Sequence, residues 1–250
     1  MYPEAPCAGA IRNPAAGLPA LHQKISSRIL IHSQKNTIPW RPVMHYLANL
    51  FQQSSDFEAY ATGYFQRVNE LARKLDLGAV RRAMEYIGKT RQNGNALYFF
   101  ANGGSAAVAA HWVNDLMAGA NEPGKPAFRA YCLSDNTSTV TAIGNDSAFE
   151  NIFRDQLRAY IRPGDVALAM SVSGNSENII RGLQAARDAG ATTIGIAGMS
   201  GGRMPACCDV FILIPSTADE YGPVEDLFSL LEHLITGWLT MSAGKWMHHG

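Results

Sequence analysis

ALYFFANGGS, at residues 96–105, joins an unbroken apolar run to a loop of small polar residues. A second stretch has the same plan, because residues 166–176 read VALAMSVSGNS. In both, a strand-like run ends in small residues and leads into a helix-like segment. Backbone N–H groups and the positive end of the helix dipole then face the loop, which favours bound anions. Several hydroxyls with few bulky side chains suit a phosphate on a sugar-like body, so the two stretches predict a sugar-phosphate pocket.

Strand-like and helix-like runs alternate through the rest of the chain. The strand-like runs are 96–101, 128–133, 165–170, 192–197 and 209–214, and the helix-like runs are 105–118, 136–143, 147–160, 176–189 and 223–241. Alternation of this kind is typical of a parallel sheet covered on both faces. We expect an α/β fold, a three-layer α/β/α sandwich with a mostly parallel five-stranded sheet. Both Ser/Gly loops then lie beyond the carboxyl ends of strands, where such sheets bind ligands.

The segment before the sheet divides into two parts. Residues 1–43 hold six prolines and no sustained periodicity, so we expect a loosely ordered N-terminal extension, and Met44 is an alternative start. Residues 44–250 are expected to form a single domain. Apolar residues at helical spacing predict a helix from Asp56 onward, with Ser55 as its N-cap, and a second over about 78–92. These two helices are interpreted as an N-terminal helical hairpin.

Composition excludes several classes of function. The 21 basic and 21 acidic residues balance, and no basic block stands out, which argues against nucleic-acid or membrane-surface partners. We expect no membrane span and no secretory leader. The four cysteines lack C-x-x-C spacing, which favours a reduced cytoplasmic protein. Neither Ser/Gly loop has the Lys of a P-loop or the G-x-G-x-x-G of a dinucleotide site, so no nucleotide cofactor is expected.

Several motifs, in this order, resemble the sugar isomerase (SIS) domain family, and within it the phosphoheptose isomerases. They are NGGS at 102–105, HWVND at 111–115, SD at 134–135, TAIGND at 141–146, SVSGNSEN at 171–178, GG at 201–202, and the last helix with Glu225, Asp226 and His233. The resemblance covers roughly Asp56 to Met241. It implies the SIS fold, a homotetramer with active sites between subunits, and the interconversion of sedoheptulose 7-phosphate with a D-glycero-heptose 7-phosphate.

The resemblance also assigns substrate contacts. It places the phosphate at Ser171, Ser173 and Ser176, with Ser105 and nearby backbone amides holding more of the sugar phosphate. The full expected substrate-binding set is Asn102, Gly103, Gly104, Ser105, Asp135, Ser171, Ser173, Asn175 and Ser176. Physical chemistry agrees on the second loop, because the free N–H groups that open its helix need an acceptor. As alternatives, the loops are ordinary turns with N-caps, and Asp135 is a turn former.

An aldose–ketose isomerase moves a proton between C1 and C2 through an enediol, and therefore needs a base and a proton donor. In the phosphoheptose isomerases the base is a Glu four residues after the His of the first motif, and its partner is a His in the last helix. A Gln eight residues before that His completes the set. Here the catalytic positions read Asp115, His233 and Glu225. Either Asp115 or Glu225 is the base. Gly119, where the family often has Arg, leaves the exact substrate open.

A metal site is a further expectation. His111 and Asp115 are four residues apart on one helix, so both can face one point, while Glu225 and His233 approach from another helix. Two His and two carboxylates are an acceptable zinc set, and some phosphoheptose isomerases hold zinc at the equivalent positions.

Alternatives stay open for two of these residues and for the function. Apolar neighbours make a core role possible for His233, and Glu225 at a helix start is also explained by the helix dipole. The alternative function is non-catalytic: some SIS proteins bind sugar phosphates as sensors, and one tetrameric member associates with the bacterial replication initiator. A third possibility is an isomerase for a pentose or hexose phosphate. The retained His and carboxylate groups favour a catalytic function over sugar-phosphate binding alone.

Overall fold

The computed structural model describes residues 45–121 and 124–245 of the chain. The expected extension at 1–43 and the alternative start at Met44 lie outside the described residues. The strands are β1 (Ala96–Ala101), β2 (Arg129–Cys132), β3 (Val166–Ser171), β4 (Thr192–Ala197) and β5 (Val210–Leu213). The α-helices are α1 (Tyr46–Gln53), α2 (Phe57–Ala72), α3 (Leu77–Asn93), α4 (Gly103–Asn114), α5 (Thr137–Asp146), α6 (Ile152–Tyr160), α7 (Glu177–Asp188) and α8 (Tyr221–Ser242). A π-helical turn (Asp115–Gly119) follows α4, and short 3-10 turns cover Phe149–Asn151 and Met204–Cys207.

The five strands form one sheet in the order β2-β1-β3-β4-β5, and every neighbouring pair is parallel. From β1 the chain first moves outward to β2, then crosses back to β3 and continues to β5 on the other side. The direction of winding therefore reverses between β1 and β3. Open parallel sheets bind ligands beyond the carboxyl ends of their strands at this kind of reversal point.

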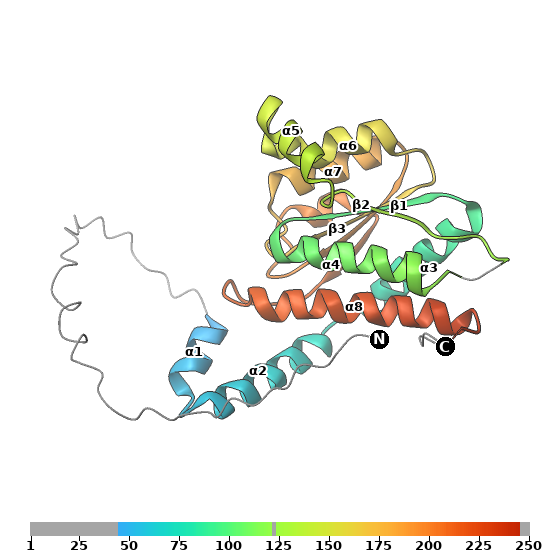
Figure 1. Cartoon of the computed structure of the whole chain (residues 1–250). Coiled ribbons are helices and arrows are strands. Elements are labelled where there is room, and N and C mark those ends of the chain that lie inside the picture. The colour runs from blue at the N-terminus through green and yellow to red at the C-terminus, as the bar shows by residue number, and fades with distance from the viewer. Residues whose placement is uncertain (1–44, 122–123, 246–250) are drawn as a thin grey trace, which may run out of the picture. The chain divides into compact units, whose positions relative to one another are not determined.

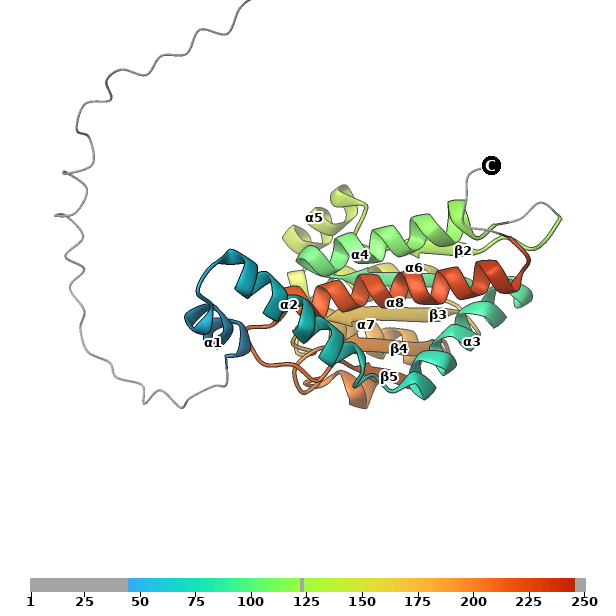
Figure 2. The ribbon, with the colours of Figure 1, turned by 90° about the horizontal axis from the view of Figure 1, so that it is seen from below.

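Helices cover both faces of the sheet (Figures 1 and 2). Successive residues of β1 alternate between the two apolar cores: Leu97 and Phe99 join the core under α3, α4 and α8, while Tyr98 and Phe100 join the core under α6 and α7. The expected three-layer α/β/α sandwich is confirmed.

The helices before the sheet are also present, with two differences. The sequence pattern did not reveal α1. The N-cap of α2 is Asp56 rather than Ser55, because the Asp56 carboxylate accepts a hydrogen bond from the backbone N–H of Ala59 at 2.8 Å. The Ser55 hydroxyl donates to that same carboxylate and so supports the cap.

Polar contacts anchor α2 to the start of α8. Arg67 pairs with the fully buried Glu220 through Nε and Oε1 at 2.6 Å. The hydroxyl of Tyr64 donates to Oδ2 of Asp226 at 2.6 Å. Burial alone would raise the pKa of Glu220, but hydrogen bonds from Arg67 and Thr217 outweigh it and hold that pKa below its ordinary value. The start of α8, which carries Glu225, is thus held by α2 at two points.

Among the described residues, each helix is too short or too polar to cross a lipid bilayer.

Candidate functional site

A cleft of about 400 Å³ opens at the reversal point between β1 and β3. Its walls are the loop after β1, the loop after β3 and the first turn of α8. The lining residues are Asn102, Gly103, Gly104, Ser105, Met170, Ser171, Val172, Ser173, Ser176, Tyr221 and Glu225. The two Ser/Gly loops that the sequence singled out therefore share one cleft. Their meeting follows from the pairing of β1 with β3, which puts both carboxyl ends at the same edge.

The loop after β3 presents hydroxyls at the start of α7. The hydroxyl of Ser171 accepts a hydrogen bond from the backbone N–H of Gly174, and that of Ser173 accepts from the backbone N–H of Asn175. Ser176 is the N-cap of α7 but makes no side-chain capping bond; its hydroxyl lies 3.5 Å from that of Ser171, so the two hydroxyls lie side by side at the start of the helix. A helix start of this kind attracts a phosphate through its N–H groups and its dipole.

A second loop supports this turn from the side. Gly174 has φ of 64°, in the left-handed region, and its backbone carbonyl accepts hydrogen bonds from the backbone N–H groups of Arg203 and Met204. A Cβ at Gly174 would collide with the carbonyl oxygen of Gly201. A Cβ at Gly202 would lie 2.6 Å from the carbonyl oxygen of Ser173. The paired glycines at 201 and 202 therefore let the two backbones touch and fix the serine turn.

The two loops that form the cleft are also joined to each other. The side-chain amides of Asn102 and Asn178 exchange two hydrogen bonds, at 3.0 and 2.8 Å. Because Asn102 precedes α4 and Asn178 lies in the first turn of α7, this pair fixes the distance between the two helix starts. The cleft is preorganised by such contacts.

Glu225 reaches the start of α4. The Ser105 hydroxyl donates to its Oε1 at 2.9 Å. The Asn102 side chain makes no capping bond to α4, so the Glu225 carboxylate is the anion that faces this helix start. Of the two helix N-termini at the cleft, α4 thus faces a protein carboxylate, whereas α7 faces hydroxyls. A phosphate is favoured at α7, and the carboxylate lies beside it in the same cleft.

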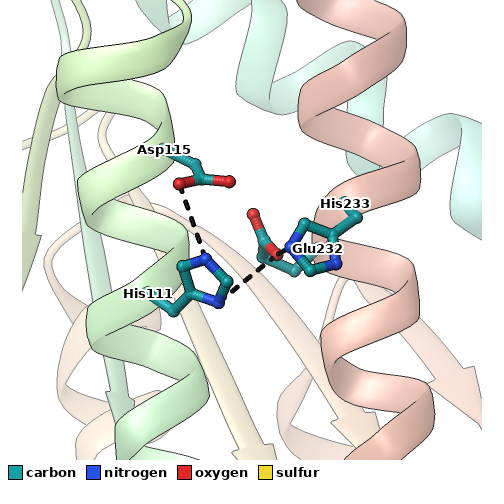
Figure 3. A group of neighbouring side chains, drawn as sticks. All are labelled: His111, Asp115, Glu232 and His233. Carbon is teal, nitrogen blue, oxygen red and sulfur yellow. Dashed lines mark ion pairs between the residues drawn. The ribbon is translucent and has the colours of Figure 1, made fainter. Parts of the chain in front are cut away.

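A second group of ionisable side chains lies further along α4 and α8 (Figure 3). His111 and Asp115 come from α4 and the π-helical turn that follows it, and Glu232 and His233 come from α8. Each residue offers a ligand atom within 4.8 Å of the others. Nε2 of His111 lies 3.6 Å from Oδ1 of Asp115, and Nε2 of His233 lies 3.2 Å from Oε2 of Glu232. The four side chains converge on one point.

Glu232 is the unusual member of this group. Its side chain is 0% exposed, whereas the His111 and His233 side chains are 43% and 53% exposed. Neither oxygen of Glu232 accepts a hydrogen bond from the described residues. Burial, followed by repulsion from Asp115, raises the pKa of Glu232 to about 8. A buried carboxylate without donors is costly unless a cation or proton neutralises it. Two imidazoles and two carboxylates around one point fit a divalent cation such as zinc.

The structure brings together three of the four expected metal ligands, His111, Asp115 and His233, but Glu225 is not with them in the same chain. Helix geometry explains the difference. Eight residues separate Glu225 from His233, which is about 12 Å along α8 and about 80° around it. Glu232 takes the fourth place, and it lies on the same face of α8 as Glu225 because seven residues make nearly two turns.

Helices α4 and α8 run in the same direction, so their facing residues pair in register. Ser105 meets Glu225, His111 meets Glu232, and near the ends Nζ of Lys245 donates to the carbonyl of Gly119. The cleft and the His/carboxylate group are consequently two separate places on one helix pair, about 10 Å apart along the axes. The spacing of Glu225 and Glu232 on one apolar helix was the signal that could have revealed the second carboxylate.

Two residues of the expected substrate-binding set, Asp135 and Asn175, do not line the cleft. Asp135 is exposed after β2 and does not line the cleft. Asn175 belongs to the serine turn, where its amide donates to the Ser173 carbonyl, but it is not among the residues that line the cleft. Tyr221, in the first turn of α8, lines the cleft, and no pattern in the sequence pointed to it.

The fold and the cleft are those of a sugar isomerase domain, and the family comparison agrees. The profile described as "SIS domain" matches residues 60–198, more than half of the chain. The chain belongs to the SIS domain family.

Within that family the chain is similar to phosphoheptose isomerases of several organisms. The chain is 38% identical over 159 residues to the phosphoheptose isomerase of Rhodospirillum rubrum, covering 64% of this chain and 83% of the relative. It is 44% identical over 139 residues to that of Trichlorobacter lovleyi, covering 55% and 69%. The solved phosphoheptose isomerase of Neisseria gonorrhoeae superposes with a TM-score of 0.65 at 29% identity, covering 73% of this chain and 95% of that one. The resemblance expected from the motifs is confirmed.

Proposed function

We propose that this protein is an aldose–ketose isomerase that converts sedoheptulose 7-phosphate to a D-glycero-heptose 7-phosphate. The observation that carries the proposal is the cleft between β1 and β3, where the serine turn at the start of α7 and the carboxylate of Glu225 face one space. A phosphate site and a basic group in one cleft are what this reaction requires. The names of the relatives support the choice of sugar.

The phosphate is assigned to the start of α7, with Ser171, Ser173 and Ser176 as hydroxyl donors. The sugar then extends toward Asn102 and Ser105, whose polar groups face the same cleft. The sugar hydroxyls have amide and hydroxyl partners there, and Asp135 adds a contact only if the substrate or a partner subunit reaches it. The binding energy of the remote phosphate holds the reacting carbons in place.

The chemistry is a transfer of one proton from C1 of the ketose to C2 through an enediol. A carboxylate removes the C1 proton and returns it to C2, while a second group moves a proton from the oxygen on C1 to the oxygen on C2. Glu225 is the base that lies in the cleft of the same chain, and Asp115 is the base if the His/carboxylate group of another subunit closes the cleft. His233 is the proton donor to the oxygens in that second arrangement.

Assembly into a homotetramer, with sites between subunits, is part of the proposal. Large apolar side chains stay exposed along one stripe of α8, at Leu230, Leu234, Trp238 and Met241. Their spacing of three and four residues puts them on one face. Exposed apolar stripes of this kind are usually buried by a partner. The stripe borders His233, so a second copy that covers it also reaches the His/carboxylate group.

Zinc is proposed as the ion at His111, Asp115 and His233. When bound, it would supply a Lewis acid that polarises a sugar oxygen. No nucleotide cofactor is proposed, and neither are nucleic-acid or membrane partners. A cytoplasmic location is supported by the free thiols of Cys132, Cys207 and Cys208 among the described residues, since such thiols persist in a reducing compartment.

Incubation with sedoheptulose 7-phosphate in deuterated water tests the proposal. The expected product is the aldose with deuterium at C2, detected by mass spectrometry and NMR. Glu225→Gln and Asp115→Asn separate the two bases, because the variant that abolishes exchange while sparing substrate binding identifies the base. Measurable binding of the ketose phosphate without any exchange would instead favour the non-catalytic, sugar-phosphate-sensing alternative.

A further inference from the structure

We infer that Glu232 is the fourth ligand of a divalent cation site that one subunit completes by itself, and that this leaves Glu225 free of the metal. The inference deepens the proposed zinc site but does not depend on the isomerase reaction. It assigns different roles to two carboxylates whose roles the sequence pattern alone does not distinguish. Glu225 belongs to the sugar cleft, and Glu232 belongs to the cation site.

The first argument is the state of the Glu232 carboxylate. It is completely buried on α8, and both oxygens lack hydrogen-bond donors among the described residues. Among the described residues no Lys or Arg forms an ion pair with it: the ionisable groups beside it are His111, Asp115 and His233, and the Thr236 hydroxyl lies one turn further along α8. A second carboxylate beside it makes an ionised Glu232 still more costly. A divalent cation removes both problems, because it neutralises two carboxylates at once.

The second argument is the direction of the donors. Figure 3 shows the Glu232 carboxylate directed from α8 toward His111 and Asp115, with the His233 imidazole beside it. The imidazole rings of His111 and His233 lie 5.0 Å apart between centroids and nearly perpendicular, at 80°. Nδ1 of His111 lies 3.9 Å from Oε2 of Glu232. One ligand atom from each of the four side chains thus lies within 4.8 Å of the others, a set of donors that a tetrahedral zinc ion accepts.

The third argument concerns the backbone. The helix widens into a π-helical turn at Asp115–Gly119, closed by a hydrogen bond from the backbone N–H of Ala120 to the carbonyl of Asp115 at 2.8 Å. π-helical turns are rare and gather at functional sites. This one begins at the carboxylate that faces Glu232. By contrast, Glu225 already accepts a hydrogen bond from Ser105 and faces the start of α4.

The inference is tested by titrating zinc into the metal-free, full-length protein in its native assembly. Calorimetry measures the affinity, and elemental analysis measures the number of zinc ions per chain. The full-length protein is first treated with a chelator, and the chelator is then removed. We expect one zinc ion per chain. Glu232→Gln keeps the shape but removes the charge, and it should weaken zinc binding at least 10-fold. Glu225→Gln is the matched control, with the same substitution on the same face of the same helix, and it should bind zinc like the parent chain.

Thermal unfolding provides a second readout that a misfolded variant cannot imitate. Without metal, Glu232→Leu should unfold at the same temperature as the parent chain or higher, because it removes a buried carboxylate that accepts no hydrogen bond from the described residues. With excess zinc, the parent should gain about 5 °C or more, and Glu232→Leu should gain little.

Each outcome decides the inference. It is overturned if the parent chain takes up no zinc, if Glu232→Gln binds zinc as tightly as the parent, or if Glu225→Gln loses zinc. The last result would mean that Glu225, of the same chain or of another subunit, takes part in holding the ion. Failure of the isomerase assay leaves these measurements unaffected, so the two proposals fail separately.

Discussion

A Cβ atom placed on Gly104 would lie 2.5 Å from Oε2 of Glu225, so the glycine makes room for the carboxylate at the start of α4. No other residue type fits at position 104 without moving Glu225. Ser105, the next residue, donates the hydrogen bond that holds that carboxylate at 2.9 Å. The cleft therefore depends on a glycine whose backbone needs no positive φ. Its role is to give space to a catalytic candidate on another helix.

Gly104→Ala should consequently reduce activity without unfolding the protein. The added methyl group displaces the Glu225 carboxylate, and small displacements at a proton-transfer site cost about 100-fold in rate. We expect kcat for the sugar phosphate to fall by about that factor, with the far-UV circular dichroism unchanged. Gly119→Ala is the matched control, because a Cβ there meets nothing within 4 Å. Equal losses in both variants would contradict the argument.

The serine turn gives a second prediction, about binding rather than rate. Ser173→Ala and Ser176→Ala each remove one hydroxyl from the proposed phosphate site. A hydrogen bond to a charged group contributes about 1.5–3 kcal/mol, so KM should rise about 10- to 100-fold while kcat changes less. Inorganic phosphate should also inhibit these variants more weakly than the parent. Ser138→Ala, on exposed α5, is the control. Unchanged KM in both loop variants would move the phosphate elsewhere.

Much of the fold could be predicted because its signals are local. The apolar strands, the alternation with helices and the glycine–serine loops all lie in short stretches, and the structure places them as expected. The Ser/Gly loops share a cleft because parallel strands end at the same edge. The helix α1 and the π-helical turn gave no such signal, since both depend on tertiary contacts rather than on periodicity.

The His/carboxylate group shows where local reasoning stops. The spacing of His111 and Asp115 correctly predicted that they face one point. Glu225 was grouped with them through the family resemblance, although eight residues of helix separate it from His233. Glu232 was overlooked because it lies in an apolar stretch of α8 that reads as core. Only the register between α4 and α8 reveals which carboxylate faces His111, and that register is a property of packing.

The exposed stripe on α8 leads to a prediction about assembly. Leu234→Glu puts a charge in the middle of the stripe, where a partner subunit would bury it at high cost. We expect the variant to run as a smaller species in size-exclusion chromatography with light scattering, and to lose activity if sites lie between subunits. Phe149→Glu is the control, because Phe149 is similarly exposed but lies on the short 3-10 turn before α6. An unchanged mass for Leu234→Glu would exclude this face as an interface.

The ion pair between Arg67 and Glu220 leads to a prediction about stability and pH. Glu220 has a lowered pKa, so its contribution to stability is complete above the ordinary carboxyl pKa and is lost as the pH falls through the lower value in the folded protein. Arg67→Met leaves the buried carboxylate without its cation and should cost about 3 kcal/mol at pH 7 in urea unfolding. The difference in unfolding free energy between the variant and the parent should shrink as the pH falls below about 5. Protonation of Glu220 then removes the unpaired buried charge from the variant and removes the ion pair from the parent.

Arg81→Met is the control for this prediction. It removes an exposed ion pair with Glu85 and should cost about 0.5 kcal/mol or less. A loss in Arg67→Met that stays constant from pH 7 to pH 4 would mean that packing, including the contact of Arg67 with the ring of Tyr46, stabilises this corner rather than charge.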